Sequence, residues 1–181
     1  LEFRRVHFRS AVRAAAGEPL QYIFGYTEFC GHRIEVGPGV LIPRPETEEM
    51  TVMIIRENGG FTGPVTDLCT GSGCIAIALS LALPGAVVTA TDLSDQALAV
   101  AQRNIRRTGA AVNLVRADIL NDDPANMPMS NVIASTPPYV TEREKAAMHH
   151  NVLDHEPHEA LFVPDKDPLI YYRAIAAVAE A

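Results

Sequence analysis

The chain has 181 residues, of which 48% are hydrophobic and 20% are charged, so it is long and apolar enough to form a core and unlike a disordered segment. Its formal net charge of −7 disfavours non-specific binding to nucleic acid. The 3 cysteines indicate a reducing, cytoplasmic setting rather than a disulfide framework, and no apolar run reaches the roughly 20 residues of a membrane helix.

The first residues are rich in arginine and predict a helix that runs to about Ala16 and stops at Gly17. Arginines recur there at helical spacing, as on a solvated helix face; they are Arg4, Arg5, Arg9 and Arg13. Another helical pattern covers residues 169–181 without a stop signal. Because both ends look like cuts through longer elements, we expect a piece of a longer protein.

Strands and helices alternate between these ends. Residues 29–36 alternate around Gly31 as a hairpin does, and residues 47–58 predict a helix with acidic residues in its first turn. Strands are then expected at 65–69, 86–91, 112–116 and 131–135, and helices at 75–83 and 95–107. This alternation is typical of a parallel sheet with crossover helices.

A glycine-rich loop follows the first strand of this sheet, at a turn into a helix whose free N–H groups can face a ligand. It matches the dinucleotide-type pattern G-x-G-x-x-A, with the sequence Gly71-Ser72-Gly73-Cys74-Ile75-Ala76. A tight turn without any ligand would need the same glycines.

Aspartates near the ends of three successive strands favour a ligand over a bare turn; they are Asp67, Asp92 and Asp118. Carboxylates around one crevice repel each other unless a ligand brings hydrogen-bond donors or positive charge. S-adenosylmethionine brings ribose hydroxyls, an adenine amine, an ammonium and a sulfonium, whereas Asp67 would oppose the pyrophosphate of NAD. The acids therefore favour a methyl donor.

The fourth strand ends in a second motif, Thr136-Pro137-Pro138-Tyr139, which resembles the Asn-Pro-Pro-Tyr motif of methyltransferases that modify planar amine or amide nitrogens. Further segments resemble the protein-(glutamine-N5) methyltransferases, which modify the Gly-Gly-Gln glutamine of peptide chain release factors. They are residues 18–25, 39–48, 67–73 and 172–175, together with Glu156-Pro157 and Ala160-Leu161. The resemblance covers about residues 17–180, and Arg44-Pro45-Glu46-Thr47-Glu48 is its most specific part.

This resemblance implies a Rossmann-like class I S-adenosylmethionine-dependent methyltransferase, with a mostly parallel sheet, helices on both faces and a short N-terminal β-hairpin. Residues 1–26 would end an N-terminal helical domain and linker, and residues 27–181 would form the catalytic domain without its last strands. In the family's strand order, 3-2-1-4-5-7-6, the strand at Val132 would then be an exposed edge. We expect residues 1–181 alone to be poorly soluble, and the full-length protein to be a cytoplasmic monomer without nucleic-acid or membrane partners.

The resemblance also assigns residues to the site. The donor would be held by Asp67, Cys69, Thr70, Gly71, Ser72, Gly73, Asp92, Leu93, Asp118, Ile119 and Thr136. The target glutamine would be bound by Thr136, Pro137, Pro138 and Tyr139, of which Thr136, Pro137 and Tyr139 would be catalytic, and no metal is needed. Arg44 and Glu46 are assigned to the substrate side; as charges in an apolar loop they either pair with each other or shape the pocket over the donor.

Thr136 departs from the family, whose motif has Asn at this position. A threonine hydroxyl is shorter and offers neither an amide oxygen nor an NH₂ group, and losing one preorganised contact often costs about 10²–10³ in rate. A weakened natural enzyme, a relaxed target choice and an engineered or misread position all fit this departure. Two other functions stay open: adenine-N6 methylation of nucleic acid, and donor binding by a homologue that has lost catalysis.

Two remaining features predict no chemistry. Residues 149–159 hold several histidines and acids, but their spacing fits no compact zinc pattern and predicts a solvated loop. Cys69 and Cys74 have no histidine near them in sequence that would activate a nucleophile.

Overall fold

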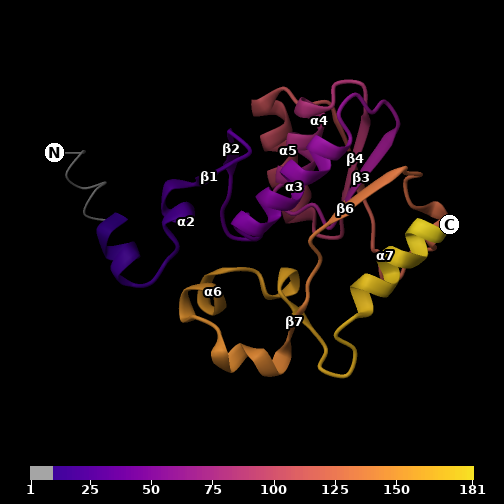
Figure 1. The fold of residues 1–181 in the computed structure, drawn as a ribbon. Coiled ribbons are helices and arrows are strands. Elements are labelled where there is room, and N and C mark those ends of the chain that lie inside the picture. Colours follow the sequence, from indigo (N-terminus) through magenta and orange to yellow (C-terminus); the bar gives the residue numbers. More distant parts are fainter. Residues whose placement is uncertain (1–9) are drawn as a thin grey trace.

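A four-stranded parallel sheet forms the centre of the computed structural model, which describes residues 10–181 (Figure 1). The strands lie in the order β5-β4-β3-β6, with bounds Val112–Arg116, Val87–Asp92, Pro64–Leu68 and Val132–Ser135. All three pairings are parallel, and Leu68 at the end of β3 pairs with both Thr91 of β4 and Ser135 of β6. The expected parallel sheet is confirmed, and its carboxyl ends meet at one edge.

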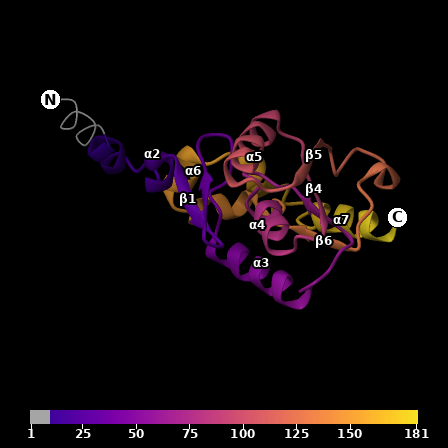
Figure 2. The same ribbon diagram turned by 90° about the horizontal axis from the view of Figure 1, so that it is seen from above.

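Three helices lie next to one another over the sheet: α3 (Pro45–Glu57), α4 (Cys74–Ala82) and α5 (Asp95–Thr108) (Figure 2). Helix α7 (Ile170–Glu180) lies on the other side of β6 from these three helices (Figure 1). The end signals of α5 act as the sequence predicts. Ser94 Oγ accepts a hydrogen bond from Ala97 N at 3.3 Å, and Gly109 ends the helix with a φ of 72°.

A β-hairpin precedes the sheet, formed by β1 (Tyr26–Phe29) and β2 (His32–Glu35). It begins before the predicted range because Tyr26 already pairs with Glu35, and its turn at residues 30 and 31 has positive φ at both positions. The short helix α2 (Leu20–Phe24) places Tyr22 in the same core as Phe29. The hydroxyl of Tyr22 donates to Val40 O at 2.6 Å, so this end of the expected linker is packed onto the domain that follows.

Short elements complete the part of the chain that the structure describes. β7 (Val140–Thr141) pairs in parallel with β8 (Phe162–Val163), and between them lie η2 (Glu142–Ala147), α6 (His150–His155) and η3 (His158–Ala160); η1 (Pro124–Asn126) precedes β6. Within residues 10–181, β6 pairs with β3 alone, and the poor solubility expected from such an edge stays a prediction.

The arginine-rich start of the chain is described only in part. The chain is helical from residue 10 to residue 15, and the predicted helix face at Arg4, Arg5 and Arg9 lies outside the described residues. None of the helices placed by the structure has both the length and the apolar character that crossing a bilayer requires.

Candidate functional site

A cavity of about 370 Å³ lies at the carboxyl ends of the strands, where open α/β sheets place their ligands. Its volume is within the range of small-molecule sites. One wall is the glycine loop after β3, a second wall follows β4 and β5, and residues 39–44, here called the cover loop, form a third. Most residues that the sequence assigned to the donor line it: Cys69, Thr70, Gly71, Ser72, Asp92, Leu93, Asp118, Ile119 and Thr136.

The glycine loop needs its glycines for two different reasons. Gly71 has a φ of 56° and open space around its missing Cβ, so backbone conformation selects glycine there. A Cβ on Gly73 would lie 3.1 Å from the Cβ of Ala101, so this glycine also lets α4 approach α5 closely. Cys69 has a φ of 59° without being glycine, which marks a strained backbone at the cavity wall.

Asp67 lies behind this loop and does not line the cavity, in contrast to the donor contact assigned to it from the sequence. Its Oδ2 accepts hydrogen bonds from Thr70 Oγ1 at 2.5 Å and from Ala76 N at 3.1 Å. These bonds fasten the loop to the first turn of α4. Its Oδ1 is buried without a partner among the described residues, and burial raises the pKa of Asp67 to about 7.

This raised pKa predicts a pH-dependent stability. The unfolded carboxyl titrates near pH 4 and the folded one near 7, so Asp67 contributes stability that is complete below pH 4 and is lost as the pH rises through 7. Between pH 5 and pH 8 this loss amounts to roughly 2–3 kcal/mol. We therefore expect Asp67→Asn, whose amide oxygen can keep both bonds, to flatten the fall in Tm over that range.

Asp118→Asn is the matched control, because the Asn121 side chain lowers the pKa of Asp118 and gives its contribution the opposite sign. Thermal melts at several pH values check both variants. If the Tm of Asp67→Asn falls as steeply with rising pH as the Tm of the unaltered protein, the prediction is contradicted.

Asp92 and Asp118 do line the cavity. The Oδ2 of Asp92 accepts from Gly71 N at 2.8 Å and its Oδ1 from Ser94 N at 2.9 Å, which fixes the carboxylate between the loop and α5. Burial raises the pKa of Asp92. Each carboxylate oxygen keeps a further lone pair, so Asp92 can still accept from ligand hydroxyls.

The segment after α6 supplies a third carboxylate to the cavity, that of Glu159, which sequence reasoning placed in a solvated loop. Its charge raises the pKa of Asp92, after the larger effect of burial. Among the described residues, the lining thus holds three carboxylates and one guanidinium, that of Arg44. This excess of negative charge suits a cationic ligand.

Glu156 fastens the cover loop over the cavity. Its side chain is 1% exposed, its Oε2 accepts from Ile42 N at 3.0 Å, and its Oε1 accepts from Arg44 Nη2 at 2.7 Å. Of the two alternatives for Arg44 and Glu46, mutual pairing is wrong, because Arg44 pairs with Glu156. Arg44 lines the cavity, whereas Glu46 is exposed and does not. The prediction of a solvated loop is wrong for Glu156 as well, because this side chain is buried. Its carboxylate supplies the counter-charge that the partly buried guanidinium of Arg44 needs.

The Thr136–Tyr139 turn contributes two of its residues to the cavity lining, Thr136 and Pro138. Pro137 is buried and Tyr139 is 58% exposed, and neither lines the cavity. The N–H groups of Tyr139 and Val140 both donate to Leu161 O, at 3.2 and 3.0 Å. The turn is thus attached to the segment that also carries Glu156.

Other residues of the site have only weak sequence signals. Tyr171 of α7 lines the cavity, and its pKa is raised by burial and then by Cys69 and two nearby aspartates. The thiol of Cys69 has its pKa raised to about 12 by burial, which does not favour a nucleophile. No group of His, Cys, Asp and Glu side chains within residues 10–181 could hold a metal ion.

A parallel sheet in this order, with a glycine loop after β3 and acids at the end of β4 and after β5, defines a Rossmann-like class I methyltransferase fold. Two solved structures share it. The Pyrococcus abyssi tRNA (uracil-54, C5)-methyltransferase in complex with S-adenosyl-L-homocysteine has a TM-score of 0.52 and 14% identity over 84% of this chain and 37% of that chain. The hMettl16 catalytic domain has a TM-score of 0.51 and 19% identity over 70% and 47%. The chain belongs to the methyltransferase small domain family, whose model matches residues 29–161.

Curated relatives extend the match over most of the chain. The release factor glutamine methyltransferase of Bacteroides thetaiotaomicron is 51% identical over 164 residues, which cover 91% of this chain and 59% of that protein. The protein of the same name from Flavobacterium psychrophilum is 45% identical over 166 residues, which cover 90% and 58%. The family resemblance seen in the sequence is thereby confirmed, and the chain spans just under three fifths of the length of these relatives.

Proposed function

We propose that this protein uses S-adenosylmethionine to methylate the glutamine N5 of the Gly-Gly-Gln motif in peptide chain release factors. The observation that carries this proposal is one acid-lined cavity bordered by the glycine loop and by the Thr136–Pro138 turn. The names of relatives at 51% and 45% identity support the protein substrate. A cytoplasmic monomer that acts in translation termination, without nucleic acid or membrane, completes the proposal.

The lining fits the donor in charge and in hydrogen-bonding chemistry. Asp92 would accept bonds from the ribose hydroxyls, Asp118 and Ile119 would border the adenine, and residues 69–72 would border the methionine end, whereas Gly73 does not line the cavity. The three carboxylates offset the positive charges of the ammonium and the sulfonium. S-adenosylmethionine, when bound, supplies a methyl group attached to a sulfonium, and the sulfur is itself a good leaving group. No metal therefore has to activate the methyl group.

The chain's own residues have to orient a poor nucleophile. The lone pair of a primary amide nitrogen is delocalised into the carbonyl, and acceptors on its two N–H bonds aim the nitrogen and stabilise the positive charge that develops on it. The Thr136 hydroxyl and the Pro137 carbonyl would be these acceptors. The Tyr139 ring, which is exposed beside them, would pack on the planar amide.

A methyl-transfer assay with labelled donor tests the proposal on three substrates: release factor, release factor with its Gly-Gly-Gln glutamine changed to Ala, and nucleic acid. We expect label on the first alone. Label on nucleic acid but not on release factor would overturn the protein substrate.

A second candidate is a donor-binding homologue without catalysis, and Thr136 is the observation that favours it. Calorimetry with S-adenosylmethionine separates the two functions. Donor binding without label on any substrate, restored to transfer by Thr136→Asn, would favour this candidate over an active enzyme.

A further inference from the structure

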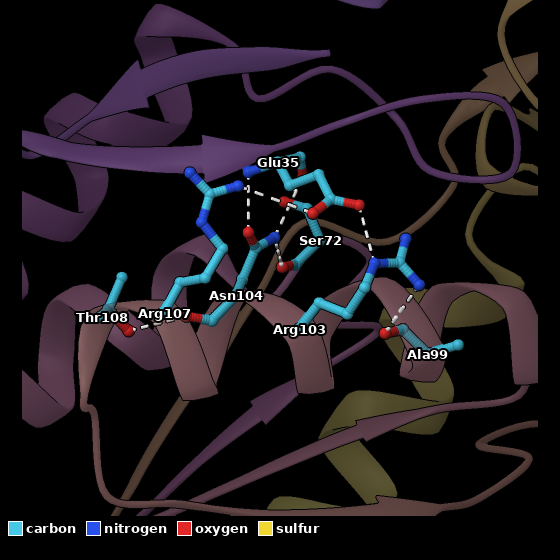
Figure 3. Close-up of polar contacts among 7 residues, drawn as sticks. All are labelled: Glu35, Ser72, Ala99, Arg103, Asn104, Arg107 and Thr108. Carbon is cyan, nitrogen blue, oxygen red and sulfur yellow. Dashed lines mark hydrogen bonds and ion pairs between the residues drawn. The ribbon is translucent and has the colours of Figure 1, made fainter.

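Asn104 is a fully buried polar side chain in the last turns of α5, and the mechanism above gives it no role. Figure 3 shows its amide between the end of the hairpin and the glycine loop. Its Oδ1 accepts from Glu35 N at 2.7 Å, and its Nδ2 donates to Glu35 O at 3.0 Å and to Ser72 O at 2.9 Å. One amide therefore joins three segments through backbone atoms, and both of its N–H bonds are used.

The glycine loop borders the donor cavity, and the end of β2 leads to it. Ser72 lines it, next to Gly71, whose N–H group holds the carboxylate of Asp92. Glu35 ends β2, and the chain runs from it through a short turn into the cover loop at Gly39. The Asn104 amide thus holds the glycine loop and the end of β2, from which the chain enters the cover loop, at a fixed separation.

The start of the cover loop also lies close to α5. A Cβ added to Gly39 would lie 2.7 Å from Oε1 of Gln96, and the φ of Gly39 is 99°. Helix α5 therefore approaches the cover loop at Gln96 and the glycine loop at Asn104, one near its first turn and one in its last turns. Of these two residues, Asn104 is the one whose side chain bonds to both the end of β2 and the glycine loop.

Ion pairs surround this contact on the outside. Arg103 Nε lies 2.7 Å from Oε1 of Glu35 and Arg107 Nη1 lies 3.6 Å from its Oε2, and both arginines are about half exposed (Figure 3). Exposed pairs of this kind contribute little, because water and salt screen them. The two arginines pair with the side chain of Glu35, whereas Asn104 bonds to its backbone. A substitution of the Glu35 side chain can therefore remove the ion pairs without removing the bonds to Asn104.

We propose that Asn104 is a positioning residue of the donor site, which holds the glycine loop and the cover loop in their ligand-binding arrangement before the ligand arrives. This inference rests on the proposed use of S-adenosylmethionine. It assigns a role in binding to a residue that touches neither the cavity nor the ligand.

Asn104→Asp removes the two N–H donors and keeps the side-chain size and the acceptor for Glu35 N. The carbonyls of Glu35 and Ser72 then face a carboxylate, so the loop moves away from its binding arrangement. If the competent arrangement falls to a tenth of the population, the apparent Kd rises about 10-fold. Asn104→Ser keeps one hydroxyl donor, so we expect a smaller rise from it, and it replaces Asn104→Asp if that variant fails to fold.

The experiment measures the Kd for S-adenosylhomocysteine by calorimetry, and hydrogen exchange of the amides of residues 69–73 without ligand, in the full chain. Glu35→Gln is the control for the ion pairs, and Ile105→Val is the control for lost stability, because Ile105 is buried in the same helix. We expect a higher Kd and faster loop exchange in the Asn104 variants, with both controls within about 2-fold of the unaltered protein.

Two results would overturn the inference: an unchanged Kd and exchange rate in folded Asn104 variants, or an equal rise in Kd for Ile105→Val at a matched Tm. Failure of the proposed function gives a different result. In that case the unaltered protein does not bind S-adenosylhomocysteine, and the exchange of residues 69–73 still decides whether Asn104 fixes the loop.

Discussion

Replacing Thr136 by Asn is expected to raise the rate of methyl transfer to release factor by about 10²–10³-fold. Thr136 follows β6 and lines the cavity beside Pro138, so a longer amide side chain at this position points its oxygen toward the same space. That oxygen would accept an N–H bond of the target amide that the shorter hydroxyl reaches poorly. Single-turnover kinetics with saturating donor measure the effect on the chemical step, separately from substrate binding.

Thr136→Val is the matched control, since it keeps the shape of threonine and removes its hydroxyl. If the hydroxyl accepts a bond from the substrate, this variant is slower than the unaltered protein. Equal rates for the unaltered protein and for both variants would show that position 136 makes no contact in the transition state, and would remove the argument for weakened catalysis.

Glu156→Ala is expected to lower the free energy of unfolding by about 2–3 kcal/mol and to weaken donor binding. The substitution leaves the buried N–H of Ile42 without an acceptor and the Arg44 guanidinium without its partner. We place the loss below the usual range for broken buried pairs, because the side chain of Arg44 is 34% exposed and water can solvate it. Denaturant unfolding and calorimetry with S-adenosylhomocysteine measure the two effects.

Two further variants separate the bonds of Glu156 to the cover loop from a general effect of charge. Glu156→Gln keeps an acceptor for Ile42 N and should recover part of the stability. Asp167→Asn breaks the exposed ion pair with Arg173 and should change stability by less than about 0.5 kcal/mol. A loss for Glu156→Ala as small as that for Asp167→Asn would contradict the role of Glu156 in holding the cover loop.

Local sequence patterns predicted the sheet and its helices well. Strand 112–116 has the predicted bounds, and α5 extends the predicted range by one residue to Thr108. These elements carry their own signals, since a serine cap, a helix-ending glycine and runs of apolar residues act within a few positions of the chain. The ends of the hairpin were less well predicted, because the Tyr26–Glu35 pairing depends on a partner across a turn.

The residues that complete the site depend on contacts between distant parts of the chain. Asp67 and Asp92 both follow the sequence rule for acids near strand ends, yet only Asp92 lines the cavity, because the helix N-terminus and Thr70 turn Asp67 behind the loop. Glu156 is one of several acids in a histidine-rich segment, and Asn104 is one polar residue of an amphipathic helix. Composition cannot single them out, since what distinguishes them is the backbone group that each one meets after folding.

The hydrogen bond between Ile42 and Glu156 joins residues 114 positions apart, with every strand of the central sheet in between. Closing so long a segment costs more chain entropy than forming a local contact. We therefore expect a long-range contact of this kind to form after the strands and helices that lie between its two ends. On a ribosome, residue 156 also emerges after β3, β4, β5 and β6. We therefore expect these four strands to form before the Ile42–Glu156 bond closes the ligand cavity. Loss of ligand affinity should then precede loss of secondary structure when the protein is gradually destabilised.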